Sequence, residues 1–390
     1  MYGAIIGDIV GSYYEILEVN AIKKEPDKKR KYEDRIRILD KNEPLFTDKC
    51  SYTDDTVLTI AIAKSILEKI PYEECLRKFG LAEQNLGLDS YGRNRFGKGF
   101  VSWLNDEKKG DSYGNGASMR ISPVAYYFEG LEKINEEAKK ATIPSHNNEE
   151  AIIGAQAVSS CIYLSRKGKT KEEIKKYIEE QFNYNLDFNI EELQKTYRFS
   201  SKTIGSVPQA IFCFLESTSF EDCLRKSISI GGDTDTIACI SCSIAEAFYG
   251  IPKNILEEAM KYLPEKYKII VDNFYKELEI KNIIYDLNIC NDDFWNYMHS
   301  RTKRINIGLN SGIWGTFVDN IIGNEFPNIK VLVPYLTTDF SYKINIHEYA
   351  HAYELYNLAI QNKNLNSLNK DESESFAKEK EKEYTLKKVL

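Results

Sequence analysis

Two short acidic clusters constrain the fold of this chain more than any other feature. Thr53-Asp-Asp-Thr56 and Asp233-Thr-Asp-Thr236 each stand immediately before an apolar segment with helical character. A single Asp or Thr at a helix start is explained by the capping of unpaired backbone amides. A helix needs only one such cap, whereas each cluster supplies two carboxylates and two hydroxyls. Capping alone therefore leaves the redundancy of both clusters unexplained.

A cation would explain this redundancy. Adjacent carboxylates repel each other unless a positive charge lies between them. Mg²⁺, Mn²⁺ and Ca²⁺ are hard cations that take oxygen ligands. If the two helix starts converge, four carboxylates and up to four hydroxyls become available to a pair of such ions. Paired ions can orient a substrate hydroxyl and lower the pKa of a water molecule. The clusters therefore predict a two-metal hydrolytic site on a helical scaffold.

Length and composition limit the classes of protein to which the chain can belong. Its 390 residues are two to three times the ~100–200 residues of a typical domain, so two domains are expected. The formal net charge of −7 argues against a general affinity for nucleic acid. Hydrophobic residues make up 42% of the chain, which excludes wholesale disorder. No apolar stretch reaches the ~18 residues of a membrane span.

The N-terminus and the cysteines favour a cytoplasmic location. The first eight residues lack a basic region and already include Asp8, so no signal peptide is expected. The eight cysteines are scattered, several of them within apolar runs. Cys239 and Cys242 form a CxxC pair, which would suit a redox or zinc site. Because no second pair follows and the surrounding segment has the pattern of a buried helix, we favour small core residues in a reducing compartment.

The residues up to about 270 have a mostly helical pattern. The segments 57–67 and 151–158 are apolar nearly all round, which is typical of central helices. Residues 170–173 form a capping box ahead of an amphipathic helix. The charged connection 20–49 is expected to be a mobile loop or flap, and the glycine-rich stretch 92–116 to be irregular.

The pattern changes after Pro264. Residues 312–318 and 329–335 have the β-branched and aromatic character of strands. A helix is predicted at about 344–359, and a charged tail begins at Asp371, where a solvated helix or a frayed end is expected. We therefore expect an all-α domain over residues 1–270 and a smaller α+β domain over residues 280–390, with the boundary at 268–282.

An ordered set of motifs resembles one enzyme family. The first ~270 residues look like the ADP-ribosylglycohydrolase family, which includes the dinitrogenase-reductase-activating glycohydrolases. The motifs occur in the family's order and span nearly the whole first domain. They are Gly3-Ala-Ile-Ile-Gly-Asp-Ile-Val-Gly-Ser-Tyr-Tyr-Glu15, Tyr52-Thr-Asp-Asp-Thr56, Gly114-Asn-Gly-Ala-Ser-Met-Arg120 with Pro123, Ser145-His-Asn147 followed by Gly154-Ala-Gln156, and Gly231-Gly-Asp-Thr-Asp-Thr236.

The resemblance implies an all-α fold with a binuclear Mg²⁺ (or Mn²⁺) centre, at which the glycosidic bond between ADP-ribose and an acceptor is hydrolysed. It implies catalytic carboxylates, of which Glu15, Asp54 and Asp55 are the candidates; the sequence leaves open which of them is the general base. Metal ligands are implied at Thr53, Asp54, Asp55, Asp233, Asp235 and Thr236. Contacts with ADP-ribose are implied at Asn115, Gly116, Ser118, Met119, Arg120 and His146.

Several of these residues also have ordinary structural explanations. Arg120 could pair with an acid or cap a carbonyl, His146 could be a loop or capping histidine, and Glu15 on its own could be a surface residue. The acceptor group is read by rim loops, not by the metal ligands. The sequence therefore leaves arginine, serine, a nucleic-acid base and a small molecule open as acceptors.

A second motif lies near the C-terminus. His347-Glu-Tyr-Ala-His351 matches HExxH, in which two imidazoles on one helix face bind Zn²⁺ and Glu348 activates water. This segment resembles the zincin metallopeptidases, which need a third ligand, often a glutamate on a later helix. Glu372 is our first choice for that ligand and Glu374 the alternative. An ordinary amphipathic helix and a solvated acidic tail are the structural explanations for the same residues.

The leading hypothesis is thus an ADP-ribosyl hydrolase acting on a modified protein or small molecule, fused to a zinc-binding domain with a possible peptidase activity. The alternative hypothesis is a zinc peptidase whose N-terminal domain only recognises ADP-ribosylated targets. A non-catalytic ADP-ribose-binding scaffold is the third. It is disfavoured because every acid that the family resemblance requires is present.

Overall fold

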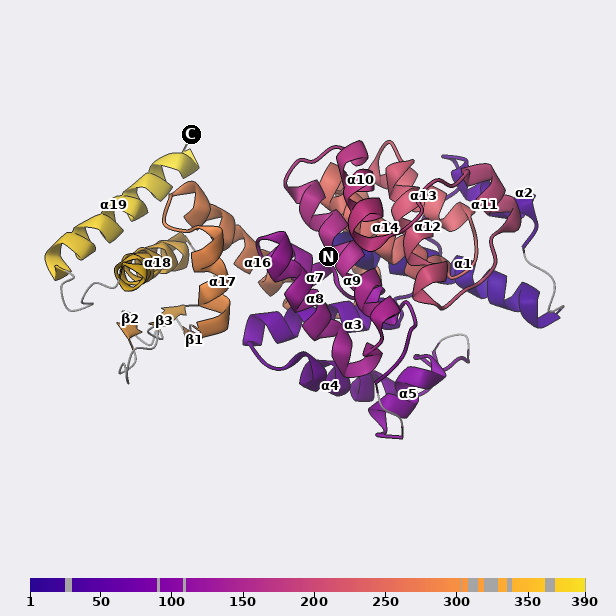
Figure 1. Cartoon of the computed structure of the whole chain (residues 1–390), viewed down its shortest axis with the longest axis horizontal. Coiled ribbons are helices and arrows are strands. Elements are labelled where there is room, and N and C mark those ends of the chain that lie inside the picture. Colours follow the sequence, from indigo (N-terminus) through magenta and orange to yellow (C-terminus); the bar gives the residue numbers. More distant parts are fainter. Residues whose placement is uncertain are drawn as a thin grey trace. The chain divides into compact units, whose positions relative to one another are not determined.

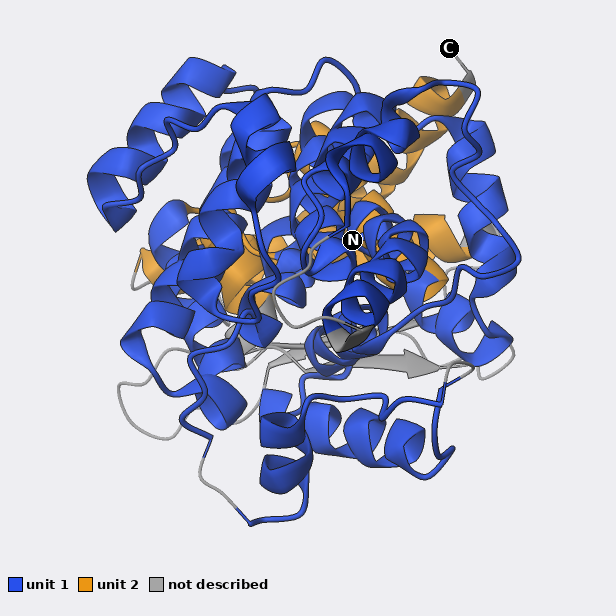
Figure 2. Ribbon diagram, turned by 90° about the vertical axis from the view of Figure 1, so that its right-hand side faces the viewer, with its two compact units in different colours: residues 1–127, 131–271 blue, residues 128–130, 272–390 orange. Residues whose placement is uncertain are grey.

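The computed structural model describes residues 1–24, 30–89, 92–107, 110–301, 303–307, 315–318, 329–334, 339–361 and 369–389. The chain divides into two compact units, which Figure 2 distinguishes by colour. Unit 1 comprises residues 1–127 and 131–271, and unit 2 comprises residues 128–130 and 272–390. The family resemblance falls on unit 1 and the HExxH motif on unit 2.

All regular elements in the described part of unit 1 are helices. Its α-helices are α1 (Tyr2–Lys24), α2 (Tyr32–Ile36), α3 (Asp54–Glu68), α4 (Tyr72–Gln84), α5 (Lys98–Leu104), α6 (Gly116–Met119), α7 (Ser122–Tyr127), α8 (Leu131–His146), α9 (Glu149–Arg166), α10 (Lys171–Phe182), α11 (Ile190–Thr196), α12 (Val207–Leu215), α13 (Phe220–Ser229), α14 (Thr234–Tyr249) and α15 (Lys253–Ala259). Short 3₁₀ helices lie at η1 (Arg37–Leu39), η2 (Thr203–Gly205) and η3 (Met260–Tyr262). Helix α16 (Glu265–Asp286) begins in unit 1 and continues into unit 2.

Helices α1 and α14 form the centre of unit 1, where they pack closely side by side (Figure 1). Glycines at every fourth position of α1 allow this approach. A Cβ atom added at Gly3, Gly7 or Gly11 would lie 2.1, 2.2 or 2.5 Å from a backbone carbonyl oxygen of α14. Any larger residue would push the two backbones apart. The first helix of the chain is thus held against a helix more than 200 residues later.

The expected central helices are present. Nearly every residue of α3 from Asp55 to Ile66 is buried, and so are most residues of α9. The predicted capping box is confirmed at the start of α10, where the Thr170 hydroxyl accepts from the Glu173 amide and the Glu173 carboxylate accepts from the Thr170 amide. Capping of this kind satisfies two backbone donors at once.

Two connections are more ordered than the sequence suggested. The described part of the 20–49 stretch contains the end of α1, helix α2 and η1, and it is tied down by buried groups. The Arg35 guanidinium, which is 0% exposed, binds both Glu18 carboxylate oxygens at 2.9 and 3.0 Å. The many charged residues of this stretch suggested a mobile flap. The sequence alone does not show that Arg35 is buried against a carboxylate of another helix. Helix α5 similarly lies within the stretch expected to be irregular.

Unit 2 combines helices with a small mixed sheet. After α16 come α17 (Asp292–Arg301), β1 (Lys303–Ile307), β2 (Gly315–Val318), β3 (Ile329–Pro334), α18 (Asp339–Ile360) and α19 (Lys370–Val389). The strand order is β1-β3-β2, with β1 parallel and β2 antiparallel to β3. Strands β2 and β3 fall within the expected strand segments; the remainder of the 312–318 segment and Tyr335 lie outside the described residues. Strand β1 was not anticipated.

Both C-terminal segments are helical, and the first helix extends beyond its predicted bounds. Helix α18 covers the expected 344–359 segment, and the charged tail forms α19, which packs against α18. Among the described residues, no helix combines the length and the apolar character needed to cross a lipid bilayer.

Candidate active site

Asp8 organises the start of helix α3. Its Oδ2 accepts hydrogen bonds from the backbone amides of Thr53 and Thr56 at 2.9 and 3.0 Å, and its Oδ1 accepts from the Thr53 hydroxyl at 2.7 Å. Asp8 is fully buried on α1. A carboxylate at this position satisfies helix amides and suits the positive end of the helix dipole. The capping role expected of Thr53-Asp-Asp-Thr56 is thus partly carried out from another helix, which leaves Asp54 and Asp55 available for other contacts.

A double-glycine turn positions the second acidic cluster. Gly231 and Gly232 have φ values of +76° and +79°, which L side chains rarely adopt. A Cβ at Gly231 would lie 2.4 Å from the Arg35 guanidinium, so the turn also needs the space. Asp233 then stands at the N-cap of α14, and the Thr234 hydroxyl donates to the Gly11 carbonyl of α1 at 2.9 Å.

The two clusters converge, as the sequence hypothesis required. Single carboxylate oxygens of Asp8, Asp55 and Asp235 lie within 4.8 Å of one another, and so do those of Glu15, Asp233 and Asp235. Asp235 belongs to both groups. The Thr236 hydroxyl lies 3.4 Å from Oδ2 of Asp55, across a sequence separation of 181 residues. The side-chain oxygens therefore form two adjacent cation-sized groups that share one carboxylate.

Burial and mutual repulsion oppose ionisation of these acids. Asp55, Asp233 and Asp235 are 2%, 7% and 6% exposed. Burial, together with the charges of Asp235 and Asp8, raises the pKa of Asp55 well above its usual value. Burial also raises the pKa of Asp233 to about 7, with Glu15 and Asp54 adding to the shift. For Glu15, burial and the charge of Asp235 raise the pKa to about 8 despite the Arg93 cation.

These observations test whether divalent cations fit the site. The donor set consists of carboxylates and hydroxyls, which suits Mg²⁺ or Mn²⁺. Oδ1 of Asp55 is buried and has no hydrogen-bond partner among the described residues. An unpartnered carboxylate oxygen is costly in a buried setting, and a cation would satisfy it. The residues therefore fit a pair of ions.

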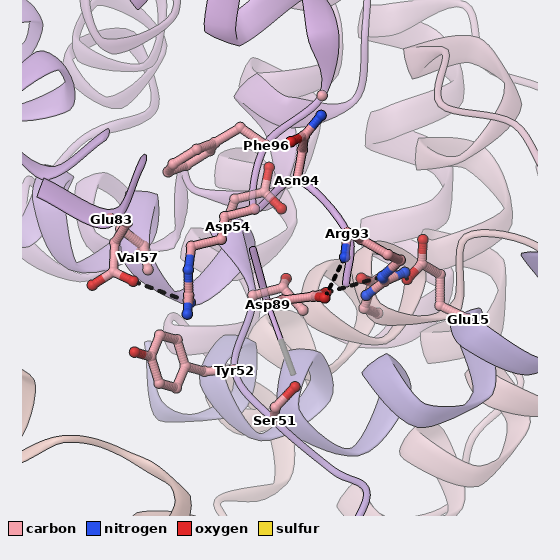
Figure 3. A pocket seen from close by; sticks show the side chains of 14 residues that line it. Glu15, Ser51, Tyr52, Asp54, Val57, Glu83, Asp89, Arg93, Asn94 and Phe96 are labelled. Carbon is pink, nitrogen blue, oxygen red and sulfur yellow. Dashed lines mark hydrogen bonds and ion pairs between the residues drawn. The ribbon is translucent and has the colours of Figure 1, made fainter. Parts of the chain in front are cut away.

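A cavity of about 220 Å³ opens beside the acidic groups. Figure 3 shows Glu15 and Asp54 at its wall, with Arg93 between Glu15 and Asp89. The Arg93 guanidinium binds Oε2 of Glu15 at 2.5 Å and Oδ2 of Asp89 at 3.0 Å. The Arg93 amide also donates to Asp89, so Asp89 binds both the backbone and the side chain of the arginine. The positively charged guanidinium of Arg93 thus contacts the acidic side of the cavity.

The glycine-rich motif lies next to the second cluster. The Asn115 side-chain amide donates to Asp233 at 2.7 Å and to the Ser206 hydroxyl at 3.0 Å. Gly116 begins the short helix α6, whose Ser118 and Met119 are buried, as is Arg120 directly after it. Asn115 thereby links the candidate substrate loop to a candidate metal ligand.

His146 is oriented by a buried hydrogen-bond chain. The Arg120 guanidinium donates to the Ser145 hydroxyl at 2.8 Å, and this hydroxyl lies 2.8 Å from Nδ1 of His146. Because Arg120 can only donate, the Ser145 hydrogen is left for His146, and the neutral ring carries its own hydrogen on Nε2. Burial and the Arg120 charge lower the pKa of His146 well below its usual value. The Nε2 side of the ring lies against Gly116.

Arg120 itself is not paired with an acid of the described part of the chain. Its guanidinium is fully buried and also donates to the Ala141 carbonyl at 3.2 Å. Its Nε and Nη1 have no partner among the described residues, and burial lowers its pKa to about 9. Arg120 therefore lies beneath the loop and acts on His146 through Ser145.

In unit 2, the structure brings both histidines of the HExxH motif together with Glu374. One ligand atom from each of His347, His351 and Glu374 lies within 4.8 Å of the others. Glu372, the first choice from the sequence, is exposed and is not part of this group, while Glu348 is buried. Glu372 and Glu374 stand on different faces of α19 because successive helical positions are rotated by about 100°.

Sequence reasoning missed three residues of the site in unit 1. Asp8 lies inside an apolar helical run. The only feature of the sequence that pointed to a functional role for Asp8 was its place in the first motif that matches the family. Arg93 and Asp89 lie in a stretch of sequence without a periodic pattern, so the contacts of Arg93 with Glu15 and Asp89 could not be anticipated.

Comparisons with known proteins agree with the motif pattern. The sequence model of the ADP-ribosylglycohydrolase family matches residues 1–282. Human ADP-ribosylhydrolase ARH3 is 25% identical over 318 residues, covering 64% of this chain and 84% of the relative. The mouse protein of the same name is 24% identical over 341 residues, covering 70% and 86%. The Escherichia coli protein YegU, described as uncharacterized, is 23% identical over 303 residues, covering 67% and 89%. The family match covers well over half of the chain, and the chain therefore belongs to the ADP-ribosylglycohydrolase family.

Proposed function

We propose that this protein hydrolyses the glycosidic bond between ADP-ribose and a modified acceptor, using two Mg²⁺ or Mn²⁺ ions. The observation that supports this most is the convergence of two buried carboxylate groups that share Asp235. Curated relatives bear the name ADP-ribosylhydrolase, and the family acts on ADP-ribosylated substrates. Membership of the family and the buried acidic groups point to the same chemistry.

The ions would be held by the residues at the two helix starts. We assign this role to Thr53, Asp54, Asp55, Asp233, Asp235 and Thr236. Asp8 positions the first set, because it fixes Thr53 and the backbone of Thr56. When bound, the ions supply charge neutralisation and polarise the oxygens of the substrate.

Acidic side chains of the cavity would accept the proton of the attacking water. Glu15 and Asp54 both line the cavity, and burial raises the pKa of Asp54 to about 7, with Asp8 contributing. A carboxyl group whose pKa lies near the working pH is suited to general acid–base catalysis. Glu15, Asp54 and Asp55 are the candidates for accepting a proton from the attacking water.

The glycine-rich loop and His146 would contact the ADP-ribose. Asn115 and Gly116 lie at the start of the loop, and His146 offers a neutral Nε2–H donor next to Gly116. Because Ser118, Met119 and Arg120 are buried, we propose that they shape this loop from below. Backbone amides of such loops suit a diphosphate.

The test is the release of free ADP-ribose from a panel of linkages, including ADP-ribosyl arginine, serine, nucleic-acid base and small-molecule adducts. Wild-type protein should release ADP-ribose only with Mg²⁺ or Mn²⁺, and Asp55→Asn and Asp235→Asn should each abolish the release. Asp106→Asn is a matched control, since this aspartate is exposed, pairs with Arg77 and belongs to neither acidic group. Undiminished release by the Asp55 and Asp235 variants would reject the proposal.

A second candidate function concerns unit 2. The grouping of His347, His351 and Glu374 favours zinc binding, and the HExxH pattern adds a possible peptidase activity with Glu348 as the base. Incubation with a peptide library tests this activity. Glu348→Gln should abolish cleavage and leave release of ADP-ribose intact. If no peptide is cleaved by zinc-loaded protein, the peptidase alternative fails.

We further propose that the protein works in a reducing compartment such as the cytoplasm. All eight cysteines are free and buried in the structure, which suits a compartment where disulfides are rare. The expected partners are ADP-ribosylated proteins or small molecules. Fractionation of cells that express the protein tests the location.

A further inference from the structure

A pair of histidines in unit 2 faces each other in an arrangement that needs a cation. His347 and His351 are one turn apart on α18, and their Nε2 atoms are 3.1 Å apart. The two rings are inclined at 74° with their centroids 4.8 Å apart. The imidazoles therefore direct the same nitrogen toward a common point.

The hydrogen-bond partners of the other ring nitrogens determine the tautomers. Nδ1 of His347 lies 2.5 Å from Oε1 of Glu381, and an ionised carboxylate can only accept. Nδ1 of His351 lies 2.6 Å from the Ser373 hydroxyl, which donates its own hydrogen to Glu354 at 2.5 Å. Both Nδ1 atoms therefore carry a hydrogen.

It follows that both Nε2 atoms of the neutral rings present lone pairs to each other. Two lone pairs at 3.1 Å repel unless a positive charge lies between them. Only two occupants remove this repulsion, namely a proton shared by the rings or a metal ion bound to both. The position of Glu374, the third member of the group, favours the metal ion over the shared proton.

Glu374 completes a metal-sized triangle. Its Oε2 lies 3.4 Å from Nε2 of His347 and 3.6 Å from Nε2 of His351. Ligands at about 2.0–2.1 Å from a tetrahedral zinc ion are about 3.3 Å apart. The three observed distances of 3.1, 3.4 and 3.6 Å surround that value. Lys378 binds the other carboxylate oxygen at 3.0 Å, so Oε2 is left for the ion.

We propose that His347, His351 and Glu374 bind one zinc ion, with Glu381 and the Ser373–Glu354 pair acting as positioning residues for the two imidazoles. Two imidazoles and one carboxylate form a donor set that zinc accepts readily. Hydrogen bonds from the remote ring nitrogens to carboxylates or hydroxyls are the usual support of such ligands. The site deepens the zinc-binding function proposed for unit 2, does not depend on peptide cleavage, and leaves a fourth coordination position for water or a substrate.

The ion would also connect two helices. His347 and His351 belong to α18, and Glu374 belongs to α19. Both helices carry positioning residues as well, with Glu354 on α18 and Ser373 and Glu381 on α19. Zinc binding should therefore protect α19 from local unfolding.

The experiment uses the full chain, stripped with EDTA and reloaded with Zn²⁺ while excess Mg²⁺ occupies the carboxylate groups of unit 1. Zinc content is measured by elemental analysis after desalting, and affinity by competition with a chromophoric chelator. Wild-type protein should retain one zinc per chain. Glu374→Gln should weaken zinc binding by more than tenfold, whereas the matched control Glu372→Gln should bind like the wild type.

Positioning is tested separately from ligation. Glu381→Gln should weaken zinc affinity about tenfold to a hundredfold, the usual effect of losing such a partner, and the exposed Glu379→Gln should not. Co²⁺-substituted protein should show the intense visible absorption of a tetrahedral site, and this band should shift in Glu381→Gln. Circular dichroism serves as the control for folding. If the spectrum of Glu381→Gln is unchanged, a shift of the cobalt band reports a change at the metal site and not a loss of folding. Hydrogen exchange in α19 should slow when zinc is added.

Clear results would overturn the inference. If wild-type protein retains no zinc, or if Glu372→Gln loses it and Glu374→Gln does not, the proposed ligand set is wrong, and a shared proton remains as the occupant. If zinc binds as expected but no peptide is cleaved, the inference stands and the peptidase function fails. Release of ADP-ribose by unit 1 is independent of either outcome.

Discussion

Replacing Asp233 with asparagine should stabilise the metal-free protein at neutral and alkaline pH, although it removes a proposed ligand. Asp233 is 7% exposed, and burial with the nearby charges of Glu15 and Asp54 raises its pKa from 3.8 to about 7. The folded protein therefore holds a proton on this group between pH 3.8 and 7 that the unfolded chain gives up. Its free energy of unfolding should fall as pH rises through that window.

The size of the effect follows from the shift. A difference of about 3 pKa units corresponds to about 4 kcal/mol, at about 1.4 kcal/mol per unit. Asparagine has nearly the same shape and can still accept from the Asn115 amide, but it carries no charge. At pH 4.5 the variant and the wild type should therefore differ little. At pH 8 without metal, the variant should be more stable by up to about 4 kcal/mol.

Urea unfolding at pH 4.5, 6 and 8, with EDTA or with Mg²⁺, measures this difference. Mg²⁺ should stabilise the wild type by about 2.7 kcal/mol at a hundredfold excess over its dissociation constant, and the variant by less. The difference in stability between Asp106→Asn, at an exposed position, and the wild type should not depend on pH or metal. The reasoning is refuted if the metal-free Asp233 variant is less stable than the wild type at pH 8, or if their difference is the same at every pH.

Three further predictions address the packing and the cavity. Gly7→Ala should lower the free energy of unfolding by about 3 kcal/mol, because its Cβ would meet the α14 backbone at 2.2 Å; thermal denaturation measures this. Arg93→Ala should tighten Mn²⁺ binding, since it removes the cation that competes for Glu15, and calorimetric titration measures the affinity. Ser145→Ala should destabilise the protein by about 1–3 kcal/mol and move the His146 hydrogen between ring nitrogens, which ¹⁵N chemical shifts report.

Controls for these variants are available in the chain. Gly99 lies within α5, and no atom lies within 4 Å of a Cβ added there, so Gly99→Ala should be neutral or stabilising. Equal destabilisation by Gly7→Ala and Gly99→Ala would contradict the packing argument. Arg95→Ala removes a cavity arginine that pairs with Glu83 instead of Glu15. Weaker Mn²⁺ binding by Arg93→Ala would show that the arginine supports the site. An unchanged ¹⁵N spectrum in Ser145→Ala would reject the hydrogen-bond chain.

The sequence was sufficient to predict the acidic clusters and their convergence. Thr53-Asp-Asp-Thr56 and Asp233-Thr-Asp-Thr236 carry more oxygens than capping needs, and that surplus is visible without a structure. The partners of these residues were not predictable in the same way. Asp8 lies within an apolar helix, and its role depends on where α1 meets the start of α3, which is a matter of tertiary packing.

The proposed zinc ligands show a different limit. The spacing of His347 and His351 places both on one helix face, whatever the rest of the fold does. The choice between Glu372 and Glu374 depends instead on the rotation of α19 against α18, which no local pattern encodes. The burial of Arg35 was missed for a similar reason, because its carboxylate partner, Glu18, is on a different helix.

The three glycines of α1 have a consequence for protein synthesis. Their neighbours on α14 leave the ribosome more than 200 residues later. Most of unit 1 must therefore be synthesised before α14 can cover the glycine face of the first helix. Until then Asp8 and Asp235 are on separate parts of a growing polypeptide, and no ion can join them. The proposed activity should therefore be absent from every chain that is arrested before α14 has emerged.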